Sequence, residues 1–369
     1  MSIQKLALAF AIVAFSVSFA VAQSGTVKVT PLGSRTGDFC AQDRALLFED
    51  PTGVRILFDP GDTVAGGQDS RLGAVDAILV THAHSVHIGN IKLAQDPNSP
   101  QALCVLGPGF GSDVTPFSNV AMIAAAKNSA VIAGSTLSTF FALRIAQLRG
   151  TTATPACAAT GLNNELIVPT AVPCTGLINP GGNRTLRRAS ASRGVVVSAV
   201  PAVHPSELQT PAFLTDPEKS NLAANAVSNY VGIANGFVVT FTNGLTVYLS
   251  GDTGLTTDME TVVNRFFHAN LTVINISNLF VTGPEQAAFA VKNLIRSRTV
   301  IPSHANEIAT TGGVVNPGTR TAQFIELLQR RDSNENSDAG DRFTPSVFVP
   351  LSGVTREFDG QARCQAGCN

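Results

Sequence analysis

The sequence predicts a protein of the α+β class with mixed β-sheets, and three observations support this prediction. Apolar strand-like runs alternate along the chain with amphipathic segments that have helical spacing. Residues 237–252 read as a β-hairpin, because two β-branched runs flank the turn-forming pair Asn243-Gly244. A hairpin is antiparallel, whereas strands separated by helices favour parallel neighbours, so both arrangements are expected. The chain has 369 residues, of which 44% are hydrophobic, so it can bury a large core.

The first half of the chain contains three apolar runs that predict buried strands, at residues 54–61, 75–84 and 102–107. Residues 119–149 are rich in alanine and predict one or two helices. Residues 151–194 are rich in Pro, Gly, Asn, Thr and Arg and show no periodicity, so we expect a long surface insert there.

The second half alternates strands and helices around the hairpin. Further strands are predicted at residues 194–204, 271–277 and 299–305. A helix is expected after Thr257, which stands at capping-box spacing from Glu260. Two more helices are expected at residues 283–297 and 320–331. One domain should therefore cover residues 23–355, with the insert at about 151–194 and a short tail at 356–369.

The N-terminus has the pattern of a secretory signal peptide at residues 1–22. Lys5 precedes an uncharged apolar run that ends in Ala20-Val21-Ala22, a small-x-small cleavage pattern. The alternative is an uncleaved anchor, although the run is shorter than the roughly 20 residues that a span requires. We expect a secreted or periplasmic protein with no stable membrane association after cleavage.

The six cysteines permit up to three disulfides in an exported protein. We expect a pair between Cys157 and Cys174, which share the turn-rich insert, and a pair between Cys364 and Cys368 is an option at the tail. Cys104 lies in an apolar run and is interpreted as a buried thiol.

The composition disfavours several kinds of partner. The net charge is −1, no long basic run exists and the chain has no Trp, so a nucleic-acid partner is not expected. A small-molecule substrate is expected instead, and the oligomeric state is left open.

Metal-type side chains follow four of the predicted strands. The run ending at residue 81 leads into His82 and His84, and the later strands lead into His204, Asp252 and His304. A lone histidine is most often structural, but strand ends converge at a sheet edge, so the joint pattern favours a zinc site. Together with His87, five of the six histidines are used in this way.

Three further residues are interpreted alongside these ligands. Asp59 ends another strand and is expected to orient a histidine ligand from behind. Gly89 is expected to allow a close backbone approach beside the site. The sixth histidine, His268, is expected at a helix end near solvent.

The motifs resemble the metallo-β-lactamase superfamily, in the branch similar to ascorbate-phosphate lactonase-like metal-dependent hydrolases. The matching pieces are ILFDPG, VDAILVTHAHSVHIGN, VPAVHP, GFVVTFTNGLTVYLSGDTGLTTDM, VTGPEQAAFAV and VIPSHA. The resemblance implies a four-layer αββα sandwich of two mixed β-sheets, with the metal site in a cleft at one sheet edge. It implies a first metal position at His82, His84 and His204, and a bridging carboxylate, Asp252, that also serves catalysis.

The resemblance implies a second metal position at His87 and His304, but here the chain departs from the family. The motif H-x-H-x-D-H has Val86 where its aspartate belongs, and valine cannot bind metal. One firmly bound zinc is therefore expected, and the second site is doubtful. Glu307 or Glu207 could substitute, although plain surface acids are the more common outcome.

The function expected from these residues is an exported zinc-dependent hydrolase. A zinc-bound hydroxide would attack an ester, lactone or similar bond, with Asp252 placing the hydroxide or passing on a proton. The alternative is a metal- or ligand-binding member of the fold whose catalysis is weak or absent because of Val86. A disulfide-stapled scaffold protein would explain the insert but not the ligand set.

Overall fold

The computed structural model describes residues 24–34, 37–93, 104, 111–209, 213–225, 229–330 and 343–368. The predicted signal peptide and most of the strand predicted at 102–107 lie outside these residues. Among the described residues, none of the helices combines the length and apolar character needed to cross a lipid bilayer.

The first sheet has eight strands in the order β20-β19-β1-β2-β3-β4-β7-β9 and is mixed. β1, β2 and β3 pair antiparallel, whereas β3, β4, β7 and β9 pair parallel. Its strands are β1 (Val27–Pro31), β2 (Leu46–Glu49), β3 (Arg55–Phe58), β4 (Ala77–Leu79), β7 (Ala130–Ala133), β9 (Cys174–Leu177), β19 (Arg356–Phe358) and β20 (Cys364–Ala366).

The second sheet also has eight strands, in the order β18-β15-β14-β13-β12-β11-β10-β8. The predicted hairpin is its centre, because β12 pairs antiparallel with both β11 and β13, and β13, β14 and β15 then run parallel. Its strands are β8 (Glu165–Val168), β10 (Asn183–Arg188), β11 (Val195–Pro201), β12 (Asn235–Thr240), β13 (Thr246–Leu249), β14 (Leu271–Asn275), β15 (Thr299–Ser303) and β18 (Ser346–Val347).

The remaining elements are helices and two small ribbons. The helices are α1 (Ser85–Ile88), α2 (Asn119–Lys127), α3 (Ser135–Arg149), α4 (Asp216–Ala224), α5 (Pro284–Phe289), α6 (Arg320–Gln329), the 3-10 turn η1 (Gly66–Gln68) and the π-helical turns η3 (Met259–Asn264) and η4 (Ala290–Ile295). The ribbons pair β5 (Ile91–Leu93) with β6 (Gly111–Asp113), and β16 (Thr310–Thr311) with β17 (Val314–Val315).

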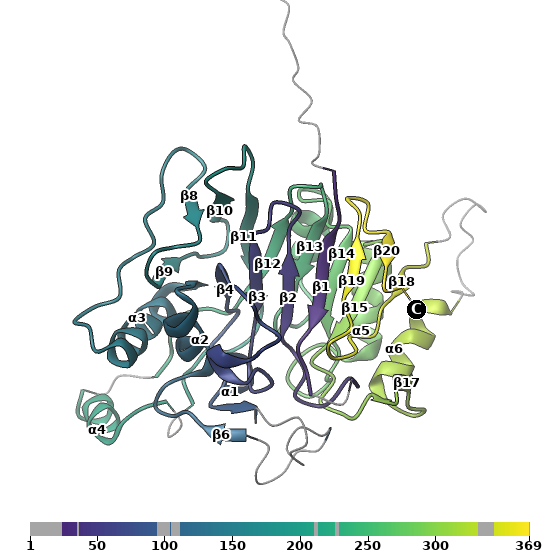
Figure 1. The fold of residues 1–369 in the computed structure, drawn as a ribbon. Coiled ribbons are helices and arrows are strands. Elements are labelled where there is room, and N and C mark those ends of the chain that lie inside the picture. The colour runs from purple at the N-terminus through teal and green to yellow at the C-terminus, as the bar shows by residue number, and fades with distance from the viewer. Residues whose placement is uncertain are drawn as a thin grey trace, which may run out of the picture.

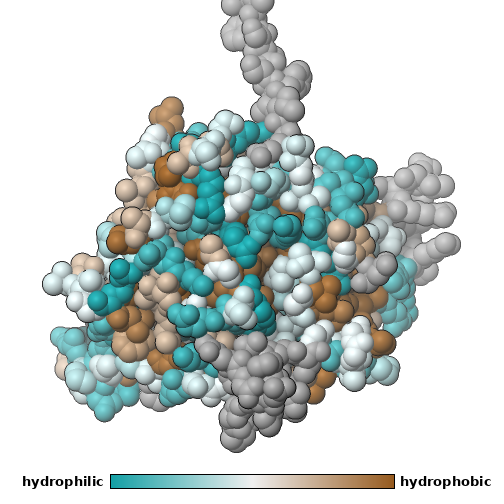
Figure 2. Space-filling view, in the orientation of Figure 1, coloured by the Kyte–Doolittle hydropathy of each residue, from teal (hydrophilic) through white to brown (hydrophobic). Residues whose placement is uncertain are grey.

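Three apolar cores define four layers, as the resemblance implied (Figure 1). The central core lies between the two sheets, where Phe48 of β2 contacts Phe241 beside β12 with ring centroids 5.7 Å apart. A second core packs α2 and α3 on the outer face of the first sheet, with Phe141 fully buried. A third packs α5, η4 and α6 on the second sheet around Val291 and Phe324. The αββα sandwich is thus confirmed. On the face shown in Figure 2, hydrophilic and hydrophobic residues are interspersed.

The structure bears on three expectations about local structure. The residues expected to form a short C-terminal tail include β19 and β20, and β19 pairs with β1 and extends the first sheet. The insert at 151–194 is not confined to the surface, because β9 joins the first sheet while β8 and β10 join the second. The Ala-rich segment 119–149 contains two helices, as expected, and the buried strand β7 between them was not predicted.

The structure pairs all six cysteines in disulfides. Cys157 with Cys174 and Cys364 with Cys368 are joined as expected. Cys104 is not a free buried thiol, because it is bonded to Cys40, 64 residues away in the sequence. This last bond ties Cys104 to the loop between β1 and β2.

Candidate metal centre

Strand ends bring the predicted ligands to one edge of the sandwich. β3 and β4 are parallel neighbours, so Asp59 and the loop carrying His82 leave the first sheet at the same edge. In the second sheet, β11, β13 and β15 point the same way, and their ends lead to His204, Asp252 and His304. The site therefore lies where the carboxyl ends of strands from both sheets meet.

A first cluster combines four of these side chains. One ligand atom from each of His82, His84, His204 and Asp252 lies within 4.8 Å of the other three. Nε2 of His204 lies 3.2 Å from Nδ1 of His84 and 3.6 Å from Oδ2 of Asp252. Nε2 of His82 lies 3.8 Å from the same Oδ2. Three imidazole nitrogens and one carboxylate oxygen thus point at one small volume.

A second cluster shares the same carboxylate. Oδ2 of Asp252 lies 3.3 Å from Nε2 of His87 and 3.2 Å from Nε2 of His304. The rings of His87 and His304 are stacked, with centroids 5.4 Å apart. This cluster offers one ligand fewer than the first, and among the described residues no second carboxylate joins it.

The donor atoms of the first cluster fit a bound metal ion. Nε2 of His82 is buried without a hydrogen-bond partner. Buried polar atoms are normally paired, so such orphans need an explanation. Three histidine nitrogens and one carboxylate oxygen make a donor set typical of zinc, which prefers four such ligands.

Electrostatics keeps the first cluster ready to coordinate. Burial lowers the pKa of His82 well below its usual value, and the neighbouring His87 lowers it further. Burial also lowers the pKa of His84 and of His204. Burial alone would raise the pKa of Asp252, but His87 and His304 outweigh it and hold that pKa well below the usual range. The cluster therefore contains neutral imidazoles and a carboxylate, which are the protonation states that bind metal.

His87 has a different environment. Burial would lower its pKa, but the carboxylates of Asp252 and Asp59 together raise it to about 9. Nδ1 of His87 lies 2.8 Å from Oδ2 of Asp59, and Nε2 faces Asp252. The ring is thus held between two acids and is protonated at neutral pH.

Asp59 contacts His87 and Thr81 on the side away from Asp252. It is fully buried and accepts hydrogen bonds from the backbone N–H of Thr81 at 3.0 Å and from the Thr81 hydroxyl at 2.7 Å. That hydroxyl also lies 3.0 Å from Nδ1 of His82. One carboxylate therefore orients His87 directly and His82 through Thr81.

The backbone is constrained around these residues. Asp59 and His304 both have positive φ, at 36° and 50°, which L-residues rarely adopt and which often marks a functional site. Gly89 has φ 76°, and a Cβ there would approach the carbonyl oxygen of Gly61 to 2.4 Å. The predicted close approach at Gly89 is therefore present, and it places α1 with His87 beside the loop after β3.

The two candidate substitute ligands lie outside both clusters. Glu307 accepts hydrogen bonds from the backbone N–H groups of Arg320 and Thr321, so it caps the start of α6. Glu207 acts on the pKa of His84 as a nearby charge, yet it belongs to neither group of converging ligand atoms. His268 is exposed at the end of the η3 segment, as predicted.

Sequence reasoning missed one charged residue at the site. Arg44, in the loop before β2, lines the same small hollow as His87, Asp252 and His304. Burial and then the Arg44 guanidinium lower the pKa of His304 to about 4. Arg44 belongs to no recognisable motif, and no local pattern in the sequence predicts that its side chain is buried at the site.

Comparisons with known proteins agree with this geometry. No protein-family model matches the chain. A UPF0173 metal-dependent hydrolase of Cupriavidus necator is 30% identical over 261 residues, which cover 69% of this chain and 68% of that protein. A UPF0173 metal-dependent hydrolase of Herpetosiphon aurantiacus is 27% identical over 288 residues, or 77% of this chain and 87% of that protein.

Solved structures extend the likeness to the fold. Igni18, a metallo hydrolase from the archaeon Ignicoccus hospitalis, superposes with a TM-score of 0.51 and 19% identity, covering 91% of this chain and 99% of that chain. This likeness supports the fold, and the identity to the curated relatives supports the activity class. The chain belongs to the UPF0173 metal-dependent hydrolases, and its αββα sandwich is the fold that the resemblance to the metallo-β-lactamase superfamily implied.

Proposed function

We propose that this metal-dependent hydrolase is an exported zinc enzyme that cleaves an ester, lactone or similar bond in a small molecule. The observation that carries the proposal is the convergence of His82, His84, His204 and Asp252 within 4.8 Å. In this proposal these four side chains hold the metal, and Asp59 orients them from behind.

Zinc is favoured by the donor set. Imidazole nitrogen and carboxylate oxygen suit Zn²⁺ in a four-coordinate site, whereas Mg²⁺ and Ca²⁺ prefer sites built from oxygen alone. When bound, such an ion lowers the pKa of water to about 7 and polarises the carbonyl oxygen of a substrate.

Asp252 has the geometry for proton transfer. Its Oδ2 faces the imidazole nitrogens, whereas its buried Oδ1 has no partner and is free to accept a proton from an attacking water. The low pKa of Asp252 keeps this oxygen ionised at neutral pH. We therefore assign Asp252 two roles, as a ligand and as the group that orients the nucleophile.

We further propose that the substrate carries an apolar group. Val203, Leu279 and Phe280 are 64%, 73% and 73% exposed. Val203 precedes His204, and the backbone of Phe280 lies against the His204 ring. The loop after Asp252 contacts Val203, because the backbone N–H of Gly254 donates a hydrogen bond to the carbonyl oxygen of Val203. We name Val203, Leu279 and Phe280 the apolar rim. Exposed apolar side chains gathered beside a polar centre are typical of a ligand-binding mouth.

Export is part of the proposal. The N-terminal pattern of residues 1–22 supports it, and the disulfides are compatible with an oxidising compartment. Fractionation of expressing cells, followed by mass spectrometry of the mature N-terminus, tests it. Recovery in the cytoplasm with residues 1–22 intact would contradict export.

A second function remains a candidate because of Val86. A member of the fold that binds a metal or ligand but turns over little would also need the first cluster, and the missing aspartate supports this alternative. Turnover on a panel of esters and lactones separates the two, since the alternative predicts metal binding without hydrolysis.

The test of the main proposal measures metal and hydrolysis together. Purified protein should contain zinc by elemental analysis and should hydrolyse members of an ester and lactone panel. His84→Ala should lose both properties, whereas His268→Ala, which changes an exposed histidine outside the clusters, should keep both. Hydrolysis that survives His84→Ala and chelation would refute the proposed centre.

A further inference from the structure

A buried arginine, Arg44, lies beside the second cluster. Arg44 is 5% exposed, and it lines a hollow together with His87, Asp252 and His304. This hollow has a volume of about 10 Å³, which is room for one species of the size of a water molecule. A buried guanidinium is always charged, so the hollow has a permanently positive wall.

Neutral groups hold this guanidinium in place. Its Nη1 donates to the carbonyl of Ala41 at 3.3 Å and to the side chain of Gln42 at 3.4 Å. Its Nη2 donates to Oδ1 of Asn306 at 2.7 Å. Nε is buried with no partner. Of the five N–H groups of an arginine, Nε–H and one Nη2–H therefore remain for another acceptor.

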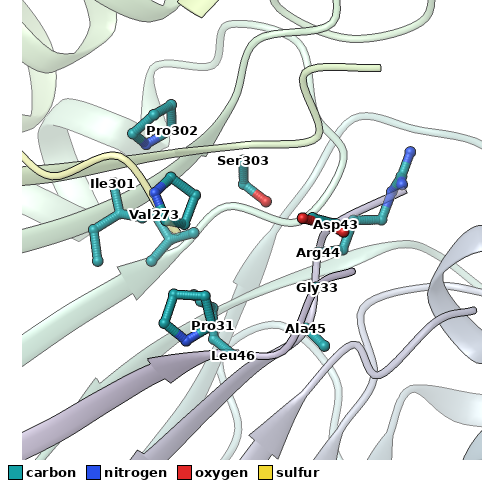
Figure 3. Close-up of a pocket in the computed structure, with 11 residues that line it drawn as sticks. Pro31, Gly33, Asp43, Arg44, Ala45, Leu46, Val273, Ile301, Pro302 and Ser303 are labelled. Carbon is teal, nitrogen blue, oxygen red and sulfur yellow. The ribbon is translucent and has the colours of Figure 1, made fainter. Parts of the chain in front are cut away.

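The compensating charges lie around the hollow rather than in contact with Arg44. Within the described ranges, no carboxylate oxygen lies at salt-bridge distance from it. Burial lowers the pKa of Arg44, and the charges of Asp252, Asp62, Asp43 and Asp59 oppose this, Asp252 most strongly. A buried charge needs such compensation. Figure 3 shows Arg44 and Asp43 beside Ser303, opposite the apolar side chains of Val273 and Ile301 in the adjoining pocket.

A second dication does not fit this arrangement. The second cluster supplies only His87, His304 and the shared Asp252, and Val86 adds no carboxylate. A metal ion in the hollow would lie beside a guanidinium in a region of low dielectric constant, where like charges repel strongly. The chain thus lacks one ligand for a second metal and carries one positive charge in its place.

We propose that Arg44 replaces the second metal ion, so that the centre binds one metal and Arg44 donates hydrogen bonds to a single oxygen in the hollow. This inference rests on the proposed function, because that oxygen would belong to the water or to the substrate carbonyl. Hydrogen bonds from a fixed guanidinium to an oxygen that gains negative charge are the kind of stabilisation that such centres require.

Zinc stoichiometry tests this inference without any measurement of activity. The wild-type protein and Val86→Asp should each bind one zinc per chain in calorimetric titration and elemental analysis, because Arg44 still repels a second ion. Val86→Asp combined with Arg44→Met should bind two zinc ions per chain, because the repelling charge is removed. Val86→Asp with Arg44→Lys should return to one.

A matched control uses another buried arginine. Arg144 of α3 is also buried but pairs with Glu218, away from both clusters. Val86→Asp combined with Arg144→Met should therefore still bind one zinc.

The outcomes separate this inference from the proposed function. Two zinc ions in the wild type or in Val86→Asp would overturn the role of Arg44 and leave the hydrolase centre intact. No zinc in the wild type would overturn both. If Arg44→Met does not fold, as judged by circular dichroism, the Val86→Asp and Arg44→Lys variants still decide the question.

Discussion

Nδ1 of His84 and Nε2 of His204 lie 3.2 Å apart, although the two residues follow strands of different sheets. Two imidazole nitrogens at this distance, facing Asp252, are stabilised when a cation binds them together. Metal binding should therefore stabilise the native state.

Removal of the metal is expected to lower the melting temperature. Zinc at about 100 times its dissociation constant should add about 2.7 kcal/mol to the free energy of unfolding, because it binds the native state preferentially. Differential scanning calorimetry with and without a chelator measures this difference. His204→Ala should melt at the same temperature in both conditions, and an equal zinc effect in this variant would contradict the assigned ligands.

Asp59→Asn is expected to weaken zinc binding by about 10- to 100-fold, because the carboxylate orients His82 through Thr81. Calorimetric titration measures the affinity. Asp113→Asn serves as the control, since Asp113 is an exposed acid in β6. An unchanged affinity in Asp59→Asn would mean that Thr81 and the backbone hold His82 without the carboxylate.

Phe280→Ala is expected to raise KM for apolar esters by about tenfold while kcat changes little, since burial of a phenyl ring contributes about 1.5–3 kcal/mol. Substrates with short polar acyl groups should be affected much less. The comparison of KM across the two substrate sets is the measurement. Phe266→Ala, which truncates a phenylalanine that is also 73% exposed but follows η3, is the matched control.

The contribution of Asp43 to the stability of the metal-free protein should decrease as pH rises from about 4 to about 7. Burial raises the pKa of Asp43 from 3.8 to about 7, so the folded state holds a proton that the unfolded state has lost in this window. This contribution to stability is complete below pH 3.8 and is lost as pH approaches 7. Its slope is at most about 1.4 kcal/mol per pH unit.

Urea unfolding at several pH values, compared between the wild type and Asp43→Asn, isolates this proton. The stability of the wild type relative to the variant should fall as pH rises through this window, whatever the absolute stability of either protein. Parallel curves would mean that Asp43 is ionised in the folded protein. The hydrogen bonds that its carboxylate accepts from the backbone N–H groups of Ser34 and Cys40 would then stabilise the charged form.

The sequence predicted the centre of the molecule better than its edges. The strands that lead to His82, His204 and Asp252 are long apolar runs, whose pattern is unambiguous, and their ends place the ligands. β7 was missed because its four residues, Ala130–Ala133, are apolar in a segment that is Ala-rich throughout, so periodicity does not distinguish it from the flanking helices.

The other missed features depend on contacts between distant segments. β19 and β20 are short, and only their pairing with β1 at the sheet edge makes them strands. Arg44 reaches the site through contacts such as the hydrogen bond to Asn306, 262 residues further along the chain. No local pattern encodes such a contact, so the positive charge in the hollow beside His87 could not be foreseen.

The ligand set is divided between the halves of the sandwich. His82 and His84 follow a strand of the first sheet, whereas His204 and Asp252 follow strands of the second. An ion held by all four would cross-link the two sheets. The sheets could then separate at this end only after its coordination is broken. Loss of the ion should therefore loosen both halves at once, and amide protons in β4 and β13 should begin to exchange together rather than one sheet at a time.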